Sequence, residues 1–299
     1  MSTHPKSRFS TLLGDYPNTH DFRTGRLRPT GVAFDFADVT VPHTAFKRAV
    51  RELEFDICEL AIVTFLMAKA AGKPLVLVPA VIFGRLFHPF LKYNPEKGPL
   101  APSDLEGKRV AIRSSSVTTV TWLRGVLARD YGVDLSKVRW VAFEDAHVAE
   151  YRDPPNVERA PAGKTISDLL VSGDVDAGVV AEGAGSDPRL RTLIPEAANA
   201  AATWQTRTGI LPINHMVVVK ASVSRDHPEA VREFYRMLVE SKAAAGLPVA
   251  GQLDTCPIGL AANRRNLEVV IDFVFTQGLI PRRYEVDELF DDATRSLGQ

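Results

Sequence analysis

The chain has 299 residues, and its 36 lysines and arginines are balanced by 36 aspartates and glutamates, so its formal net charge is zero. This length suffices for two lobes of ordinary domain size. The even charge balance excludes a strongly basic protein, so we expect no nucleic-acid partner and no anionic membrane surface as a partner. The two cysteines, Cys58 and Cys256, form no CxxC pair and are compatible with a reducing compartment.

The N-terminal stretch MSTHPKSRFSTLLGDY contains no apolar signal-peptide region and no small-residue cleavage site. The apolar runs AIVTFLMAKAA and LVLVPAVIFG are shorter than the ~18 residues that a membrane span requires. We therefore expect a cytoplasmic protein. The sequence leaves open whether the chain forms a homo-oligomer.

The first part of the chain alternates strand-like and helix-like patterns. We expect strands at 9–13 and 32–36, a helix at 45–52, a helix near 60–71 and a strongly apolar strand at 75–83. Alternation of this kind is typical of an α/β protein with largely parallel sheets.

A segment rich in proline, glycine and charged residues, 95–108, is typical of a connector, and the alternation restarts after it. The expected order is then strand 110–112, helix 119–131, strand 138–143, helix 166–172 and strand 177–180. After a second connecting region near 195–213, we expect a strand at 215–219 and helices at 228–245, 264–277 and 286–297.

A hydroxyl-rich turn separates the expected strand 110–112 from the helix that follows it. Arg113 comes first, and the hydroxyls belong to Ser114, Ser115, Ser116, Thr118 and Thr119. The first N–H groups of a helix lack intrahelical partners and carry partial positive charge, so they favour a carboxylate or phosphate. Serine and threonine also serve as ordinary helix N-caps, which is the structural alternative. The number of hydroxyls beside an arginine favours a site for a small anion.

Three charged or titratable side chains interrupt apolar segments earlier in the chain. Glu59 follows an expected strand end, where open α/β sheets bind ligands, although a carboxylate there also fits a simple helix N-terminal charge. Arg85 and His88 lie within VLVPAVIFGRLFHPF. Because burying an unpaired charge costs several kcal/mol, this pair has either a ligand role or a structural ion-pair role.

Two later histidines are further candidates. His147 follows the expected strand 138–143 and comes just after Glu144 and Asp145, which can orient or charge an imidazole ring. His215 follows Asn214 at the start of an expected strand. Taken singly, each histidine also fits a structural or surface residue.

No cofactor motif accompanies these residues. His88, His147, His215 and Glu59 match no metal-binding spacing, although an assembled three-histidine site stays open. The nucleotide motifs GxGxxG and GxxxxGK[ST] and the serine-hydrolase motif GxSxG are absent. We therefore expect a site without a cofactor or a metal.

Several segments together resemble a known family. They are FDICELA (55–61), GRLFHPF (84–90), SVTTVTWLRGVLARDYGVD (116–134), EDAHVAEYRDPPNV (144–157), SGDVDAGV (172–179) and TGILPINHMVVVK (208–220). The order of segments resembles the type II periplasmic-binding-protein fold and, within it, the 4,5-dihydroxyphthalate decarboxylases and their relatives. The resemblance covers roughly residues 8–245. It implies a two-lobed α/β fold with a ligand cleft between lobes that close by a hinge.

The resemblance also implies lobe limits and an activity. Lobe one would combine 1–104 with 209–299, and lobe two would be 105–208. The activity would be cofactor-independent decarboxylation of a hydroxylated aromatic acid, so the partner would be a small aromatic carboxylate. The alternative is a solute-binding protein that holds such a carboxylate without chemistry.

The resemblance implies roles for the candidate residues too. A set of cations, hydroxyls and an amide would bind the substrate: Arg85, Arg113, Ser114, Ser115, Ser116, Thr118, Thr119 and Asn214. The proton donor would be one of His147, His215, Glu59 and His88. Because His147 and His215 would lie in different lobes, they would approach each other only on closure.

Overall fold

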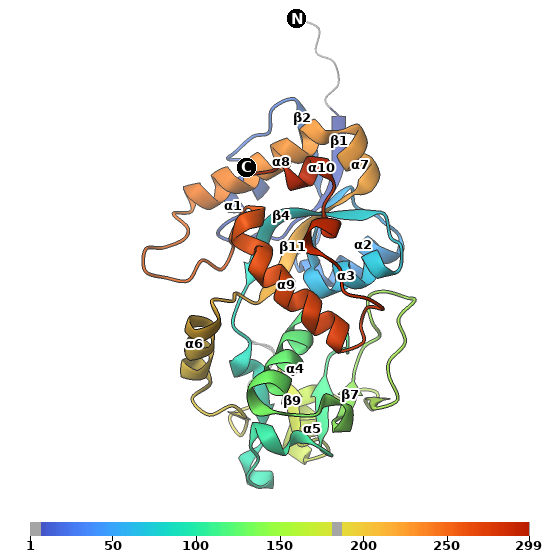
Figure 1. Ribbon diagram of the computed structural model, residues 1–299, viewed down its shortest axis with the longest axis vertical. Coiled ribbons are helices and arrows are strands. Elements are labelled where there is room, and N and C mark those ends of the chain that lie inside the picture. The colour runs from blue at the N-terminus through green and yellow to red at the C-terminus, as the bar shows by residue number, and fades with distance from the viewer. Residues whose placement is uncertain (1–6, 181–186, 299) are drawn as a thin grey trace, which may run out of the picture. The chain divides into compact units, whose positions relative to one another are not determined.

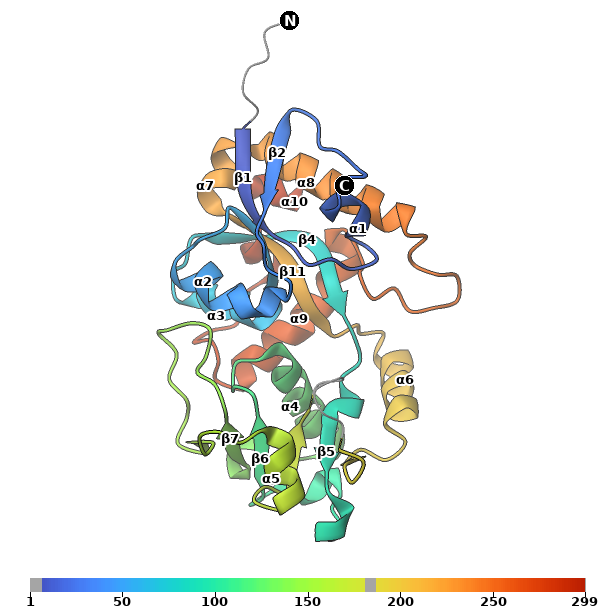
Figure 2. The ribbon, with the colours of Figure 1, turned by 180° about the vertical axis from the view of Figure 1, so that it is seen from behind.

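The structure, a computed structural model, describes residues 7–180 and 187–298 (Figures 1 and 2). It contains two β-sheets with helices packed on them, and it divides into two compact units. Unit 1 comprises Met1–Arg85, His147–Ala149 and Ile213–Gln299, and unit 2 comprises Leu86–Ala146 and Glu150–Pro212. Among the helices of the described residues, none is both long enough and apolar enough to cross a membrane.

The sheet of unit 1 has the strand order β2-β1-β3-β11-β4. Its strands are β1 (Ser7–Leu12), β2 (Val32–Phe36), β3 (Ile57–Ala61), β4 (Leu75–Gly84) and β11 (Ile213–Lys220). The first three strands are mutually parallel, and β11 runs antiparallel to both β3 and β4. The late strand β11 therefore lies between β3 and β4, in a sheet whose other strands come from the first 84 residues.

Helices of unit 1 pack on this sheet and on one another. They are α1 (His20–Arg23), α2 (Phe46–Arg51), α3 (Ile62–Ala70), α7 (Ala221–Asp226), α8 (Pro228–Ala244), α9 (Leu260–Thr276) and α10 (Asp292–Arg295). Phe234 of α8 contacts Phe22 of α1 and Phe34 of β2 edge-to-face, with ring centroids 5.2 and 5.1 Å away. These rings bury large apolar areas in a preferred geometry, so they hold α1 and α8 against the strands β1 and β2 (Figure 2).

The sheet of unit 2 has the order β10-β5-β9-β6-β7-β8. Its strands are β5 (Leu91–Tyr93), β6 (Arg109–Ile112), β7 (Arg139–Ala142), β8 (Val157–Arg159), β9 (Ala177–Val179) and β10 (Arg191–Thr192), and its helices are α4 (Thr118–Tyr131), α5 (Ile166–Ser172) and α6 (Ala197–Thr208). The strands β9, β6, β7 and β8 pair in parallel, and β5 joins β9 in antiparallel orientation. Leu169 and Leu170 of α5 pack on Ala111 and Val141 in the core of this unit.

Two expectations about elements are wrong. The region near 195–213, expected to be a connector, contains the helix α6. Its alanines give little apolar periodicity, so the sequence pattern did not indicate a helix. In the structure Ala197, Ala201 and Trp204 are buried at helical spacing. The expected helix 286–297 is instead a 3₁₀ turn (Val286–Leu289) followed by the short helix α10, because the Asp291 side chain caps a new start by accepting from the Thr294 N–H.

The units divide the chain after Arg85 and after Pro212. Strand β5, which the sequence led us to expect in lobe one, pairs with β9 in the sheet of unit 2. The lobe limits given above, at 104/105 and 208/209, stay a prediction.

Candidate functional site

A buried carboxylate in unit 1 gathers three hydrogen-bond donors. Glu59 lies on β3 and is fully buried. Its Oε2 accepts from the Gly14 N–H at 2.8 Å, and its Oε1 accepts from the Tyr16 hydroxyl at 2.7 Å and pairs with Nδ1 of His215 at 2.6 Å. An ionised carboxylate accepts hydrogen bonds without donating any, and three converging donors match that requirement. Glu59 is therefore not the plain helix N-terminal charge that the sequence also allowed.

Strand register explains why Glu59 meets His215 across 156 residues of sequence. In the antiparallel pair of β3 and β11, His215 lies opposite Ala61 and Val217 lies opposite Glu59. Since alternate residues of a strand share a face, Glu59 and His215 are diagonal neighbours on one face. Asn214, which is half-buried, lies where the pairing of β11 with β4 shifts register.

The carboxylate fixes the imidazole of His215. Glu59 accepts at Nδ1, so that nitrogen carries the proton and Nε2 is left as the nitrogen that can exchange one. Phe46 contacts the imidazole edge-to-face at 5.1 Å between ring centroids, and Phe83 contacts it at 5.7 Å. The side chain of His215 keeps 12% exposure, whereas that of Glu59 keeps none. This is an oriented acid–base group in aromatic surroundings.

Tyr16 completes the cluster, although it was not among the residues expected from the sequence. Its ring stacks on Phe83 with centroids 6.0 Å apart, and the Arg85 guanidinium lies 4.4 Å from the centroid of the Phe83 ring. Burial and the nearby Glu59 charge raise the pKa of the Tyr16 phenol, so the hydroxyl stays protonated and donates to Glu59. The place of Tyr16 in the sequence could have indicated its role. Tyr16 follows β1, which is parallel to β3, and parallel strands end at the same edge of a sheet.

Replacing Gly14 by alanine is expected to disrupt this cluster. A Cβ at residue 14 would lie only 2.5 Å from Cε2 of Tyr16, so the ring would have to move away from Glu59. We expect a stability loss of about 1–3 kcal/mol, as for other overpacked sites. Thermal unfolding measures it, and Tyr16→Phe, which keeps the ring but removes the hydroxyl, separates packing from the lost hydrogen bond. An alanine variant as stable as the wild type would show that this contact does not constrain Tyr16.

His147 corrects an expectation about the lobes. We expected it to lie apart from His215, but residues 147–149 belong to unit 1, as His215 does. The Nδ1 atom of His147 is 2.8 Å from the Thr64 hydroxyl, and the ring contacts Phe46 edge-to-face at 5.8 Å. Phe46 thus contacts both imidazoles. The idea that the two histidines meet only on closure is wrong, because the chain returns His147 to unit 1 before β8.

Unit 2 contains the hydroxyl-rich turn between β6 and α4. Four of its predicted residues are buried there, namely Ser114, Ser115, Ser116 and Thr118, and Thr119 is half-buried. The N-cap of α4 is Val117, which has no capping hydroxyl, and the Oγ atoms of Ser114 and Ser116 lie 3.3 Å apart. An ordinary serine N-cap is therefore not what this turn forms. Arg113 begins the turn, with its Nε 4.0 Å from a carboxylate oxygen of Glu144.

His88 packs inside unit 2. It is 3% exposed, and its ring lies 5.6 Å from the Trp204 ring of α6. Burial lowers the pKa of its imidazole, so the ring is neutral near pH 7. The structure thus brings together Glu59, His215, Tyr16, Arg85 and His147 in unit 1, whereas Arg113, the hydroxyl-rich turn and His88 belong to unit 2.

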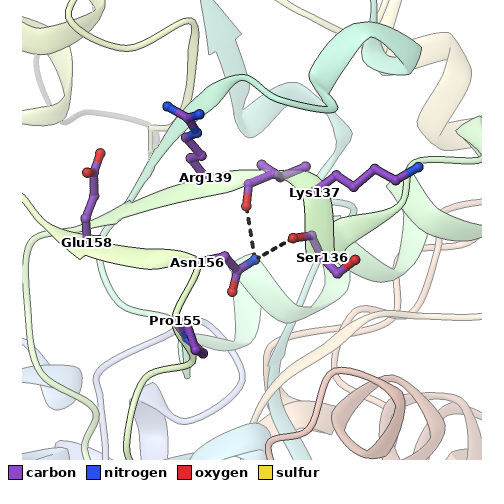
Figure 3. Close-up of a pocket in the computed structure, with 7 residues that line it drawn as sticks. Ser136, Lys137, Arg139, Pro155, Asn156 and Glu158 are labelled. Atoms are coloured by element: carbon purple, nitrogen blue, oxygen red, sulfur yellow. Dashed lines mark hydrogen bonds between the residues drawn. The ribbon is translucent and has the colours of Figure 1, made fainter.

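Within 7–180 and 187–298, no three His, Cys, Asp or Glu side chains are grouped so as to hold a metal ion. A surface pocket in unit 2 is lined by Ser136, Lys137, Val138, Arg139, Pro155, Asn156 and Glu158 (Figure 3). The Asn156 amide there donates to the carbonyls of Leu135, Ser136 and Val138 and so braces a turn. None of the candidate site residues lines this pocket.

Comparison with known proteins identifies curated relatives. A 4,5-dihydroxyphthalate decarboxylase of Comamonas testosteroni is 28% identical over 332 aligned residues, which cover 97% of this chain and 98% of the relative. A 4,5-dihydroxyphthalate decarboxylase of Pseudomonas putida is 30% identical over 212 residues, covering 67% of this chain and 81% of the relative. No family model matches the chain.

Solved structures establish the fold. The alkanesulfonate-binding protein SsuA of Xanthomonas axonopodis pv. citri aligns with a TM-score of 0.57 at 16% identity, covering 97% of this chain and 99% of that one. The periplasmic aliphatic sulphonate binding protein SsuA of Escherichia coli aligns with a TM-score of 0.54 at 13% identity, covering 95% and 97%. The expected α/β, two-lobed fold class is thereby confirmed. The chain belongs to the 4,5-dihydroxyphthalate decarboxylase family, on the fold of the type II periplasmic binding proteins.

Proposed function

We propose that this protein is a cofactor-independent decarboxylase of a hydroxylated aromatic carboxylic acid, with 4,5-dihydroxyphthalate-like compounds as substrates. The observation that carries the proposal is the buried Glu59–His215 pair, which presents one imidazole nitrogen among aromatic rings. The curated relatives, named as 4,5-dihydroxyphthalate decarboxylases, support the substrate class.

The chemistry needs one proton and no electron carrier. A hydroxyl para to a ring carboxylate lets the carboxyl-bearing carbon accept a proton, because the hydroxyl can release its own proton and form a dienone. The dienone is a vinylogous β-keto acid. Its C–C bond to the carboxylate breaks, CO₂ leaves, and the electron pair restores the aromatic ring as a phenolate. The phenolate then takes up a proton, so the net change replaces CO₂ by hydrogen.

In this proposal His215 donates the proton from Nε2 to the ring carbon. Glu59 holds Nδ1 at 2.6 Å and supplies the negative charge that stabilises the imidazolium. Tyr16 and the Gly14 N–H keep the carboxylate in place. We favour His215 over His147 because Nδ1 of His147 meets the neutral Thr64 hydroxyl rather than a carboxylate. His88, which burial keeps neutral, is the weaker donor.

Substrate carboxylates are bound, in the same proposal, by cations and by the turn before α4. Arg113 and the buried hydroxyls of Ser114, Ser115, Ser116 and Thr118 form a carboxylate site in unit 2, with Thr119 in the first helical turn. In unit 1, Arg85 beside Phe83 is a second carboxylate ligand, and Asn214 is a further substrate contact.

The test is to incubate the purified protein with 4,5-dihydroxyphthalate and to follow release of CO₂ and appearance of dihydroxybenzoate. We expect turnover without added metal or cofactor. Phthalate, which carries the two carboxylates but no hydroxyl, should bind and not react. Tight binding of intact 4,5-dihydroxyphthalate without CO₂ release would instead identify a solute-binding protein.

A further inference from the structure

A buried arginine of unit 2 lies against the turn that precedes α4. Arg124 belongs to the second turn of α4 and is 6% exposed. Its guanidinium stacks on the Trp140 ring of β7, with the guanidinium carbon 3.9 Å from the ring centroid. Its Nη1 donates to the Ser115 carbonyl oxygen at 3.3 Å. Helical side chains point toward the helix N-terminus, which accounts for this reach back to the turn.

The charge of Arg124 has no close counter-ion among the described residues. Its Nε and Nη2 atoms are buried without a hydrogen-bond partner there. Asp153, whose charge attracts the guanidinium, is itself paired with Arg159 at 3.1 Å. Burial lowers the pKa of the guanidinium to about 10, and the attraction of Tyr151 and Asp153 offsets only part of that effect. A buried cation left unpaired in this way is costly to the folded protein.

The turn itself contains a second unsatisfied group. The hydroxyl of Ser115 is fully buried, and within the described part of the chain it has no hydrogen-bond partner. The carbonyl of the same residue is the group that Arg124 holds. A carboxylate bound at this turn would accept from the Ser115 hydroxyl and would offset the guanidinium charge. One ligand of one chemical class therefore satisfies both buried groups.

We infer that Arg124 is a positioning residue of the carboxylate site in unit 2. It holds the Ser115 peptide, so that the Ser115 hydroxyl and the first N–H groups of α4 can meet a carboxylate, and it adds positive charge that the protein leaves unneutralised. Its hydrogen bond is with the Ser115 carbonyl, so it acts through the Ser115 peptide rather than by touching the ligand. The inference rests on the proposed function of this turn as a carboxylate site.

The experiment compares Arg124→Met with wild-type protein, using phthalate as the probe. Titration calorimetry should show phthalate binding at least tenfold weaker in the variant, because the Ser115 peptide is no longer held and the nearby positive charge is lost. In turnover of 4,5-dihydroxyphthalate, KM should rise in parallel and kcat should change much less. The unliganded variant should melt at the same temperature as the wild type or higher, because it no longer buries an unpaired charge.

If Arg124 only stabilises the fold, its replacement should lower the melting temperature and leave phthalate affinity unchanged. That result would overturn the inference. Arg129→Met is the matched control, because it removes an exposed positive charge from the same helix and should leave phthalate affinity within twofold. If Arg124→Met does not fold, Arg124→Lys decides, since it keeps the charge but loses the planar fork. Weaker phthalate binding with unchanged melting supports the inference, and unchanged binding overturns it.

Failure of the carboxylate site itself gives a different result. If wild-type protein does not bind phthalate, or if Arg113→Ala binds it as tightly as the wild type does, the proposed site falls and the role of Arg124 falls with it. If Arg113→Ala weakens phthalate binding while Arg124→Met does not, the carboxylate site stands and only the role of Arg124 is wrong.

Discussion

Replacing His215 by glutamine is expected to lower kcat for 4,5-dihydroxyphthalate by about 10²–10⁴-fold while phthalate affinity changes only a few-fold. Glutamine keeps a polar group beside Glu59, but its amide cannot deliver a proton to a ring carbon. The loss should therefore fall on the chemical step. Release of CO₂ measures kcat, and calorimetry with phthalate measures binding separately.

A matched control exists in the same unit. His227 pairs with Glu229 at 3.3 Å, but there both side chains are exposed, at 43% and 55%. His227→Gln removes an imidazole next to a carboxylate without touching the buried cluster, so its kcat should stay within twofold of the wild type. If His147→Gln loses turnover and His215→Gln does not, His147 is the donor. Near-normal turnover in variants of all four candidates, with Glu59 and His88 included, would place the acid elsewhere.

Strong periodicity in the sequence predicted the longer elements of the fold. The apolar residues of 228–245 recur every three or four positions, and the helix α8 runs from Pro228 to Ala244 with Ala230, Val231 and Phe234 in the core. The strand expected at 75–83 is β4. Short edge strands such as β8 and β10 have too few residues for an alternating pattern, and tertiary pairing alone defines them.

The candidate site was predictable residue by residue but not as an arrangement. Glu59 stood out as a carboxylate after an expected strand end, and His215 stood out as an imidazole after Asn214 at the start of an expected strand. Their pairing depends on β11 entering the sheet beside β3, a strand order that a single sequence does not specify. Tyr16 has no motif of its own and acquires a role only through that order. His147 was assigned to the wrong unit because the return of 147–149 to unit 1 is a property of tertiary packing.

Because the Glu59 carboxylate is buried, we expect its replacement to have a large effect on the cluster. It is fully buried on a central strand, and three donors surround it at 2.6 to 2.8 Å. A buried carboxylate is tolerated only when it is paired and hydrogen-bonded. The three donors supply these bonds to Glu59, and their arrangement relies in turn on the negative charge of Glu59.

Replacing Glu59 by glutamine is expected to lower kcat by about 10²–10⁴-fold, although Glu59 does not touch the substrate in this proposal. The amide removes the negative charge that stabilises the imidazolium, and its NH₂ group cannot accept from all three donors. Loss of the charge alone should leave phthalate affinity changed only a few-fold, with the effect on kcat. Purely structural damage would instead lower the melting temperature and weaken phthalate binding together with the rate.

The double variant Glu59→Gln/His215→Gln tests whether the two residues act as one unit. If Glu59 works only by orienting and charging His215, its loss has no further consequence once His215 is gone, so the double variant should turn over about as fast as His215→Gln alone. Single-turnover measurements on the four proteins give the coupling directly. Multiplicative losses, with the double variant slower than His215→Gln by the full factor of Glu59→Gln, would mean that Glu59 acts on the substrate independently and that the proposed division of roles is wrong.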